Sequence, residues 1–572
     1  MSLSRRSLLK LGAVGAGATA AGLVLPLGQS ASTSDWVSSL PASRMPKPYA
    51  RRLALPPSLP YREMADADGP YRLYTVTQRG GWMNIIDDLP TPAYGYGYVD
   101  VQGNQQFSVP GPVVRVPRGT RVKLRMKNDL PAAHAQWGYP MSTSTHLHGS
   151  ASLPQYDGYA DDLTQPGAYK DYWYPNVQSA RTLWYHDHGV HHTAQAVYSG
   201  LAAQYHLHDD AEQALLPQGR YDVPLTISDA LFDTTGRLVY QDNQFSGVWG
   251  DVILVNGTPW PFLEVQRRTY RFRILMATLS RSMNLRLVNV QTRQAVPVHI
   301  VATDGGLVPL SQQVTSWRHA GAERYEIIVD FGAFGSLPAG SSFELRNTSA
   351  RNNRDYLHTG KVMQFRLSDA PVEDWTNNTV PSALVSSTVM GLSAGQSSRT
   401  RRLELKHDDT TNVFSFNGKT WRDVQASGNG ALVDGTEAAA GAVEIWELWN
   451  TSGGWFHPVH IHLVDFKVLS RKGGSGRVEA WERGPKDVVY VGEAEVVRLI
   501  TKYDMPPGAA GAAGGKYMIH CHNLPHEDND MMGQFQVGRT PDVNDPITTA
   551  PAQPIPPDGE YSDGPEQLAD RV

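Results

Sequence analysis

The stretch "GPVVRVPRGTRVKLRMKN", Gly111–Asn128, alternates apolar and basic residues around a turn at Pro-Arg-Gly. Short alternating runs bounded by Pro and Gly are typical of half-buried strands. Similar runs recur as "RRTYRFRILMA" at 267–277, "ERYEIIVDFG" at 323–332 and "VEIWELWN" at 443–450. Few long segments have helical periodicity, so the sequence predicts an all-β protein of sandwiches or barrels.

Length and composition indicate several domains and small partners. The chain has 572 residues, of which 41% are hydrophobic and 19% charged, with a net charge of -5. Domains commonly span about 100 to 200 residues. No long Lys/Arg run is present, so there is no electrostatic reason to expect nucleic acid or an anionic membrane as a partner.

Changes in composition near 209–220 and 368–388 suggest domain boundaries. We therefore expect three β-domains, a linker and a tail rich in Pro and acidic residues. Their limits are 45–210, 211–370 and 401–540 for the domains, 371–400 for the linker and 541–572 for the tail.

The N-terminal segment predicts export. Arg5 and Arg6 precede an apolar, Ala/Gly-rich run at 11–27, which is shorter than the roughly 20 residues that span a bilayer. The pattern resembles the bacterial twin-arginine signal, used by proteins that fold before export. Residues 1–31 are thus expected to be a removable signal recognised by the export machinery, leaving a periplasmic or secreted protein without a stable membrane anchor.

Cys521, in "HCHNLPHEDNDMM" at 520–532, is the only cysteine of the chain. A single cysteine cannot form an internal disulfide, and an unprotected thiol outside the cytoplasm tends to oxidise. Cys521 is therefore either an inert core residue or a metal ligand, and its neighbours must decide between the two.

Ten of the nineteen histidines fall into four compact clusters, whereas chance predicts on the order of one H-x-H pair at this histidine content. On a strand, residues two apart share a face, so each H-x-H pair offers two imidazoles to one site. The clusters are His146 and His148; His186 and His188; His457, His460 and His462; and His520, His522 and His526.

The same alternation of side chains between the two faces of a strand, or parity, separates the histidines and Cys521 into two sites. It places Cys521 on the face opposite His520 and His522, and His457 on the face opposite His460. His457 and Cys521 can therefore join His526 and a nearby methionine. Two imidazoles, a thiolate and a weak thioether are the ligands of a blue-copper electron-transfer centre, whereas the thioether adds nothing for zinc.

The remaining eight clustered imidazoles are too many for one metal ion and enough for three, with open positions for a small ligand. Cys521 is covalently linked to His520 and His522, which offers a short electron path between the two sites. The arrangement predicts multi-electron reduction of a small molecule.

In order and spacing, the four clusters resemble those of the multicopper oxidases, and the resemblance covers nearly the whole mature chain. "HLHGSASLPQYDGYADD", "GGWFHPVHIHLVDFKVLSR", "PKDVV" and "HCHNLPHEDNDMMGQF" are similar to the bilirubin oxidase branch. "VILVNGTPWPFLEVQRRTYRFRILMA" and "AGAERYEIIVDFG" are similar to spore-coat laccases and phenoxazinone synthases. The resemblance implies three cupredoxin-like Greek-key β-barrel domains.

The resemblance also implies four copper ions: one type 1 in the third domain, and one type 2 and two type 3 in a cluster between the first and third. The implied ligands are His457, Cys521, His526 and Met531 for type 1; His146 and His460 for type 2; His148, His186 and His522 for one type 3 ion; and His188, His462 and His520 for the other.

By resemblance, the activity is one-electron oxidation of phenolic, aminophenolic or tetrapyrrole donors coupled to reduction of O2 to water. Asp157 and Glu527 match carboxylates that handle protons, although both could be solvated surface acids. Trp455 matches a position near the substrate edge formed with His457 and His526, although it could simply pack.

Two other functions remain open. A metallo-oxidase acting on Cu(I) or Mn(II) would be favoured by a Met-rich insertion, but outside "DMM" the methionines are scattered. A non-enzymatic copper-binding envelope protein would have little reason to keep every ligand position.

The other nine histidines are given no metal-binding role. The pair at 206 and 208 is expected on a surface strand, and His191 and His192 near the cluster in a supporting or structural role. The five scattered ones are His134, His299, His319, His358 and His407.

Overall fold

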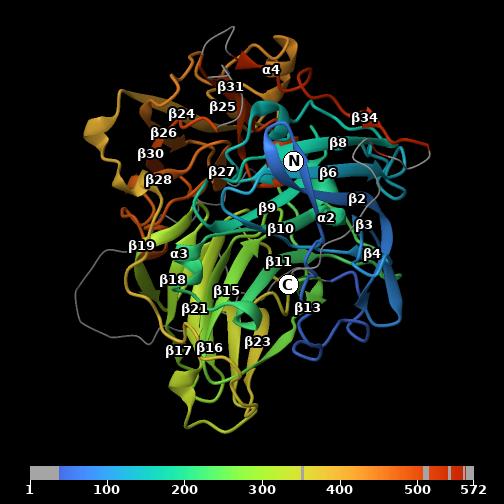
Figure 1. The fold of residues 1–572 in the computed structure, drawn as a ribbon, viewed down its shortest axis with the longest axis vertical. Coiled ribbons are helices and arrows are strands. Elements are labelled where there is room, and N and C mark those ends of the chain that lie inside the picture. The colour runs from blue at the N-terminus through green and yellow to red at the C-terminus, as the bar shows by residue number, and fades with distance from the viewer. Residues whose placement is uncertain (1–37, 349–352, 507–513, 539–542, 558–560, 562–572) are drawn as a thin grey trace, which may run out of the picture. The chain divides into compact units, whose positions relative to one another are not determined.

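The computed structural model describes residues 38–348, 353–506, 514–538, 543–557 and 561 (Figure 1). The predicted export signal lies outside these residues. Strands dominate, and no helix in the described part of the chain is long and apolar enough to cross a bilayer. The α-helices are α2 (Thr193–Ser199), α3 (Asp210–Gln213), α4 (Trp421–Ala426) and α5 (Leu524–Asp528). Short 3-10 helices span Pro154–Tyr156, Gly219–Tyr221, Gly332–Phe334, Thr388–Gly391, Ala394–Gln396 and Ala480–Glu482.

The first pair of sheets forms from the blue to cyan part of the chain in Figure 1, with one strand added from the tail. Its inner faces bury a core that includes Val76, Leu124 and Leu183. The larger sheet contains β1 (Arg62–Asp66), β2 (Gly69–Ile86), β3 (Leu89–Val99), β4 (Gln105–Ser108), β6 (Val122–Asp129), β8 (Ala168–Tyr174) and β34 (Gln553–Pro554). The smaller has the order β5 (Val114–Pro117), β10 (Ala202–His208), β9 (Arg181–Asp187), β7 (Thr145–His148).

The second pair lies between residues 222 and 367 and encloses a core that includes Phe272, Ile327 and Phe365. One sheet has the order β13 (Thr258–Pro259), β12 (Val252–Val255), β11 (Asp222–Ala230), β15 (Thr269–Met276), β21 (Arg324–Asp330), β18 (Val298–Thr303), β19 (Gly306–Val314). The other contains β14 (Phe262–Val265), β23 (Lys361–Leu367), β22 (Ser342–Asn347), β16 (Met283–Asn289), β17 (Ala295–Val296) and β20 (Trp317–His319).

The third pair carries the last two histidine clusters, and its core includes Trp446, Val459 and Cys521. One sheet has the order β25 (Val413–Phe416), β24 (Arg399–Asp408), β26 (Val443–Asn450), β30 (Val496–Lys502), β28 (Phe466–Lys472). The other contains β29 (Val488–Val491), β27 (His457–Ile461), β31 (Gly514–Cys521), β32 (Met532–Val537) and β33 (Val543–Asn544).

The prediction of an all-β protein is confirmed, because three pairs of sheets account for the described core. The expected limits 45–210, 211–370 and 401–540 enclose these pairs, apart from the first two residues of β24 and the short strands β33 and β34 of the tail. That each segment is a domain of its own stays a prediction.

Candidate functional site

Four strands bring the eight predicted histidines together. β7 pairs with β9 so that His146 lies opposite His186, and β27 pairs with β31 so that His460 lies opposite His520. The ring centroids of His148 and His460, which belong to different sheets, are 3.6 Å apart in a stacked arrangement. All eight side chains are buried, with at most 2% of their surface exposed. One enclosed cluster of imidazoles results.

Within this cluster, three groups of imidazoles have possible ligand atoms within 4.8 Å of one another. Two of them are the sets that the resemblance implies for the type 3 ions, and the third joins His148 to the implied type 2 pair. The groups are His148, His186 and His522; His188, His462 and His520; and His146, His148 and His460. The division into copper types stays a prediction.

The hydrogen bonds of His146 and His460 show that this cluster fits a cation. Their Nδ1 atoms lie 2.5 Å from the Asp157 carbonyl oxygen and 2.8 Å from the Asp487 carbonyl oxygen. A carbonyl only accepts, so each Nδ1 carries the proton and each Nε2 carries a lone pair. The two Nε2 atoms face each other at 3.4 Å. Burial and the neighbouring histidines lower the pKa of both rings, which disfavours a shared proton.

Other ring nitrogens of the cluster are also placed to bind a cation. The Nε2 atoms of His188 and His520 face each other at 3.2 Å. Both nitrogens of His522 and the Nε2 atoms of His186 and His462 are buried without a hydrogen-bond partner in the described structure. Buried polar atoms are rarely left unsatisfied, whereas metal ions commonly bind neutral imidazole nitrogens in proteins. The residues present therefore fit metal ions.

Asp157 and Glu527 are buried against these rings, so the interpretation as surface acids is wrong. Asp157 Oδ2 accepts from Nδ1 of His462 at 2.8 Å, and Glu527 Oε2 lies 2.7 Å from Nδ1 of His520. Burial raises the pKa of Asp157 well above its usual range. Burial also acts to raise the pKa of Glu527, but charge on His520 and His188 outweighs it and holds that pKa to about 2. When those rings are neutral, their lowering effect on the pKa of Glu527 is lost, while burial still acts to raise it.

Asp487 and Arg324 complete the surroundings of the cluster but were missed in the sequence. Asp487 Oδ1 accepts from Nε2 of His148 at 3.1 Å, and Arg324 donates to the same oxygen at 2.7 Å. Burial raises the pKa of Asp487 to about 6, with Arg324 opposing it. The motif "PKDVV" contains Asp487, but nothing in the sequence pairs that residue with an arginine in another sheet. A carboxylate on a ligand histidine fixes the tautomer and orientation of its ring.

Cys521 lies on the other side of β31, together with His457 and His526. Sγ is 3.3 Å from Nδ1 of His457 and 3.7 Å from Nδ1 of His526, and the two nitrogens are 3.4 Å apart. Burial raises the pKa of the Cys521 thiol, so a thiolate there needs a cation beside it. Met531 is buried in the same core, and its backbone N–H donates to the His526 carbonyl at 2.9 Å.

The substrate edge that we expected at His457 and His526 is not exposed in the structure. The side chains of His457 and His526 are fully buried, so neither ring offers an exposed edge. Phe414 stacks on His526 at a centroid distance of 3.9 Å, and the half-buried Trp455 meets His526 edge-on at 5.2 Å. An electron that enters through His526 would therefore cross the rings that cover it.

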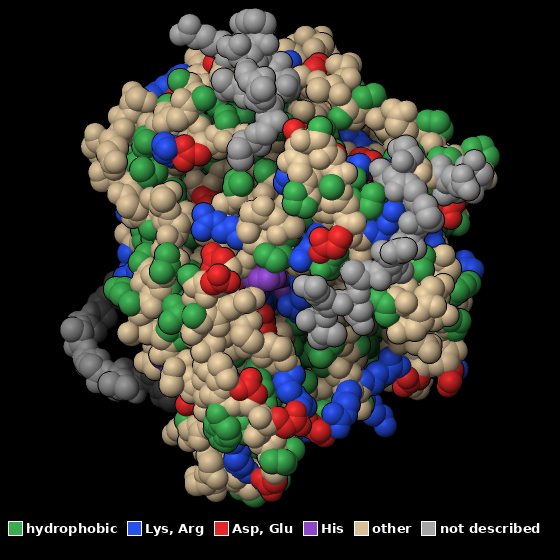
Figure 2. Space-filling model, in the orientation of Figure 1, with side chains coloured by type: hydrophobic (Ala, Val, Ile, Leu, Met, Phe, Trp, Pro, Cys, Tyr) green, Lys and Arg blue, Asp and Glu red, His purple; other side chains and the backbone are tan. Residues whose placement is uncertain are grey.

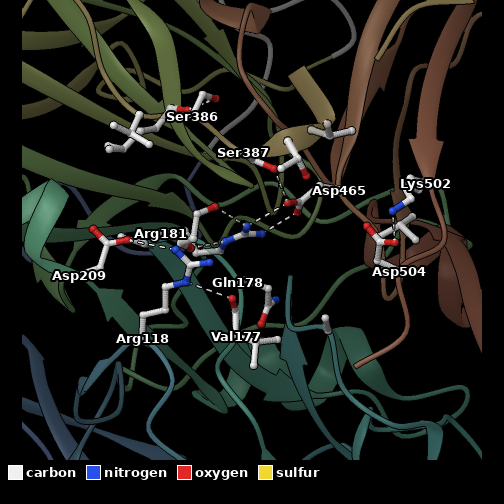
Figure 3. A pocket seen from close by; sticks show the side chains of 18 of the residues that line it. Arg118, Val177, Gln178, Arg181, Asp209, Ser386, Ser387, Asp465, Lys502 and Asp504 are labelled. Carbon is white, nitrogen blue, oxygen red and sulfur yellow. Dashed lines mark hydrogen bonds and ion pairs between the residues drawn. The ribbon is translucent and has the colours of Figure 1, made fainter. Parts of the chain in front are cut away.

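A cavity of about 550 Å³ lies beside the end of the β27 segment (Figure 3). No histidine lines it, and its charged groups pair with one another. Arg181 donates to both carboxylate oxygens of Asp465, and Lys502 lies 2.5 Å from Asp504. This cavity offers no reactive group to a substrate.

The histidines at 206 and 208 do not lie on a surface strand, so that prediction is wrong. β10 is an inner strand of its sheet, and His206 is buried, with Nε2 2.7 Å from Oε1 of Gln204. The supporting position expected for His192 agrees with the structure, where Nδ1 lies 3.7 Å from Oδ2 of Asp187.

Two family models described as multicopper oxidase match residues 396–541 and 101–212. The chain is 39% identical over 459 residues to a bilirubin oxidase of Albifimbria verrucaria, covering 78% of this chain and 74% of that protein. It is 32% identical over 529 residues to a laccase of Bacillus subtilis, covering 83% and 94%. A solved structure of a variant of the McoA multicopper oxidase of Aquifex aeolicus matches with a TM-score of 0.72 at 28% identity, covering 86% of this chain and all of that one.

This structure and the other solved multicopper oxidases that match the chain consist of cupredoxin-like β-domains, which confirms the predicted fold class. The likeness extends over most of the chain and includes all four histidine clusters. The chain belongs to the multicopper oxidase family, copper-dependent oxidoreductases that use O2 as electron acceptor.

Proposed function

We propose that the protein holds four copper ions in the predicted arrangement and oxidises small phenolic, aminophenolic or tetrapyrrole donors while reducing O2 to water. The observation that carries this proposal is the pair of facing Nε2 lone pairs of His146 and His460, 3.4 Å apart in an enclosed cluster of eight imidazoles. Relatives named bilirubin oxidase and laccase support the choice of organic donors.

Bound copper would supply one-electron uptake beside Cys521 and reduction of O2 within the histidine cluster. Cys521 would link the two, because peptide bonds join it directly to His520 and His522. Asp487 orients His148 through a side-chain hydrogen bond and His460 through its carbonyl. Glu527, whose Oε1 lies 3.6 Å from Nδ1 of His188, would hold and deliver a proton beside the cluster, and Asp157 would do so beside His462.

The donor is expected to be a small molecule with little charge selectivity. Figure 2 shows acidic and basic side chains interspersed on the face in view, which suits a chain with a net charge of only -5. Such a surface lacks the one-sided field that steers highly charged partners.

We also propose export of the folded protein by the twin-arginine route, on the evidence of Arg5 and Arg6 in the N-terminal segment. Replacing both with lysine should retain the protein in the cytoplasm, as cell fractionation measures. Unchanged export of that variant would contradict the route but not the activity.

O2 uptake with a panel of donors tests the proposed activity. The panel is bilirubin, 2,6-dimethoxyphenol, an o-aminophenol, Cu(I) and Mn(II). Uptake with at least one organic donor is expected, with one O2 consumed for four electrons delivered. Uptake with the metal ions alone would instead establish a metallo-oxidase, and a copper-loaded protein without uptake would be a binding protein.

A further inference from the structure

A tight turn outside the copper clusters stacks three aromatic rings. The backbone N–H of His134 donates to the Tyr139 carbonyl at 2.9 Å, and Nδ1 of His134 accepts from the backbone N–H of Trp137 at 3.1 Å. The rings of His134 and Trp137 are consequently parallel within 2°, with centroids 4.1 Å apart. Tyr139 also stacks on His134, with a centroid distance of 5.1 Å and an angle of 21° between the rings.

The rings of His134 and Trp137 form a wall of a cavity of about 300 Å³, together with Trp82 and Tyr94, and Tyr139 lies behind His134. Trp82 lies on β2 with 69% of its surface exposed, which is unusual for so large an apolar side chain. Arg237 adds an exposed cation to the lining. Small-molecule sites have volumes from roughly 300 Å³ upward, with aromatic walls and a few polar groups. The cavity therefore suits a single planar aromatic ring with an electron-rich or anionic oxygen.

The ring contacts continue inward from this cavity towards the histidine cluster. Tyr139 stacks on His192 with a centroid distance of 5.6 Å and an angle of 28°. His192 packs so closely on Gly189 that a Cβ at that glycine would overlap its ring. Gly189 directly follows His188, and Asp187, which contacts His192, joins His186 to His188. An unbroken series of contacts thus runs from the cavity to two cluster histidines without passing Cys521.

We propose that this cavity is a second oxidation site for phenolic donors, and that the rings from Trp137 to His192 carry the electron to the histidine cluster. The proposal rests on O2 reduction at that cluster, the proposed function. Indole and phenol rings are the side chains most readily oxidised by one electron, and Trp137 is the one on this path that lines the cavity, so the oxidising equivalent is placed there.

Reduction of O2 to two waters takes four electrons and four protons. When only three electrons have entered through the Cys521 site, Trp137 supplies the fourth and becomes a cation radical. A phenol in the cavity then returns one electron to Trp137, becomes a phenoxyl radical and releases its proton to solvent at the mouth of the cavity.

Binding to the cavity is tested on the copper-loaded protein with 4-nitrophenol, a phenol that resists one-electron oxidation, by titration calorimetry. Trp82→Ala should weaken binding at least fivefold, because it removes an exposed wall at little risk to folding. Trp375→Ala is the matched control, since Trp375 is 59% exposed and does not line the cavity. Equal affinity in the wild type and Trp82→Ala would overturn the binding site.

The ring path is tested by giving the copper-loaded protein three electron equivalents, mixing it with O2 and freezing it for electron paramagnetic resonance. A narrow organic-radical signal is expected in the wild type and in Trp375→Phe, and a signal at least fivefold smaller in Trp137→Phe, which keeps an aromatic ring in place. Added 2,6-dimethoxyphenol should shorten the life of the radical in the wild type and less so in Trp82→Ala.

The absence of a radical in the wild type, or an equal signal in Trp137→Phe, would overturn the path. A wild type that consumes O2 normally but forms no radical refutes only this second site. A wild type that consumes no O2 with any donor refutes the proposed function itself.

Discussion

At the scale of single residues, the buried carboxylate of Glu527 is the most informative group. Its oxygens face Nδ1 of both His520 and His188. Glu527→Gln keeps the shape but cannot give up a proton, so O2 turnover should fall by about 100-fold or more, as for loss of a general acid. The absorption of the Cys521 site should remain. Steady-state O2 uptake checks this, with the exposed Glu373→Gln as control; turnover equal to that of the control would rule out the proton-relay role.

Asp487 supports a second prediction at this scale. Its carboxylate holds the buried Arg324 and the ring of His148. Asp487→Asn removes the negative charge at nearly constant volume, so affinity of the histidine cluster for copper should fall by roughly 10- to 100-fold. Copper content after dialysis against a chelator measures the effect. Retention equal to the wild type would show that Asp487 only neutralises Arg324.

The residues of the two sites differ in how far the sequence predicted them. The imidazoles and Cys521 occur in short motifs, and the structure brings together the same sets. Asp487 and Arg324 could not be paired, because their contact joins two different sheets. The sequence also could not show that Phe414 covers His526, since that stacking depends on the packing of β25 against α5.

At the scale of elements, α2 and α5 depend on each other. His192 precedes α2 as its N-cap and makes no side-chain cap, and the carboxylate of Asp528 on α5 accepts from the backbone N–H groups of Thr193 and Ala194, each at 2.9 Å. Asp528→Ala leaves two buried donors unpaired, so we expect a loss of about 1–2 kcal/mol, as for removal of a helix cap. Asp528→Asn keeps one acceptor and should lose less.

The thermal midpoint of copper-free protein measures this effect for both variants. Equal midpoints for the wild type and Asp528→Ala would show that water replaces the cap.

The sequence predicted the face-to-face alternation of β27 and β31 because parity is a local property of a strand. It could not predict this cap, which forms between residues more than three hundred positions apart.

At the scale of the whole molecule, a buried charge network joins the first and second pairs of sheets. Arg273 on β15 donates to Asp222 at 2.8 Å and to Glu326 at 3.1 Å, and Glu326 accepts from Thr182 on β9 at 2.7 Å. Burial raises the pKa of Asp222, but Arg273 and Arg271 outweigh it and hold that pKa to about 2. Its folded-state pKa is therefore below its unfolded value of about 4.

A group of this kind stabilises the fold above its unfolded pKa, and that stabilisation is lost as the pH falls from about 4 to about 2. Asp222→Asn should accordingly lower stability at pH 7 by about 2 kcal/mol, a difference that disappears near pH 2. Thermal midpoints of both proteins across this pH range check the sign. A difference that is constant with pH would show that Asp222 acts through packing alone.

In the proposed arrangement, Cys521 joins an electron-collecting copper to a three-ion histidine cluster. Copper per chain and visible absorption, compared between the wild type and Cys521→Ser, test it most directly. We expect about four copper ions and an intense blue band in the wild type, and about three ions without that band in the variant. A blue band that survives in Cys521→Ser, or a copper-replete wild type without colour, would contradict it.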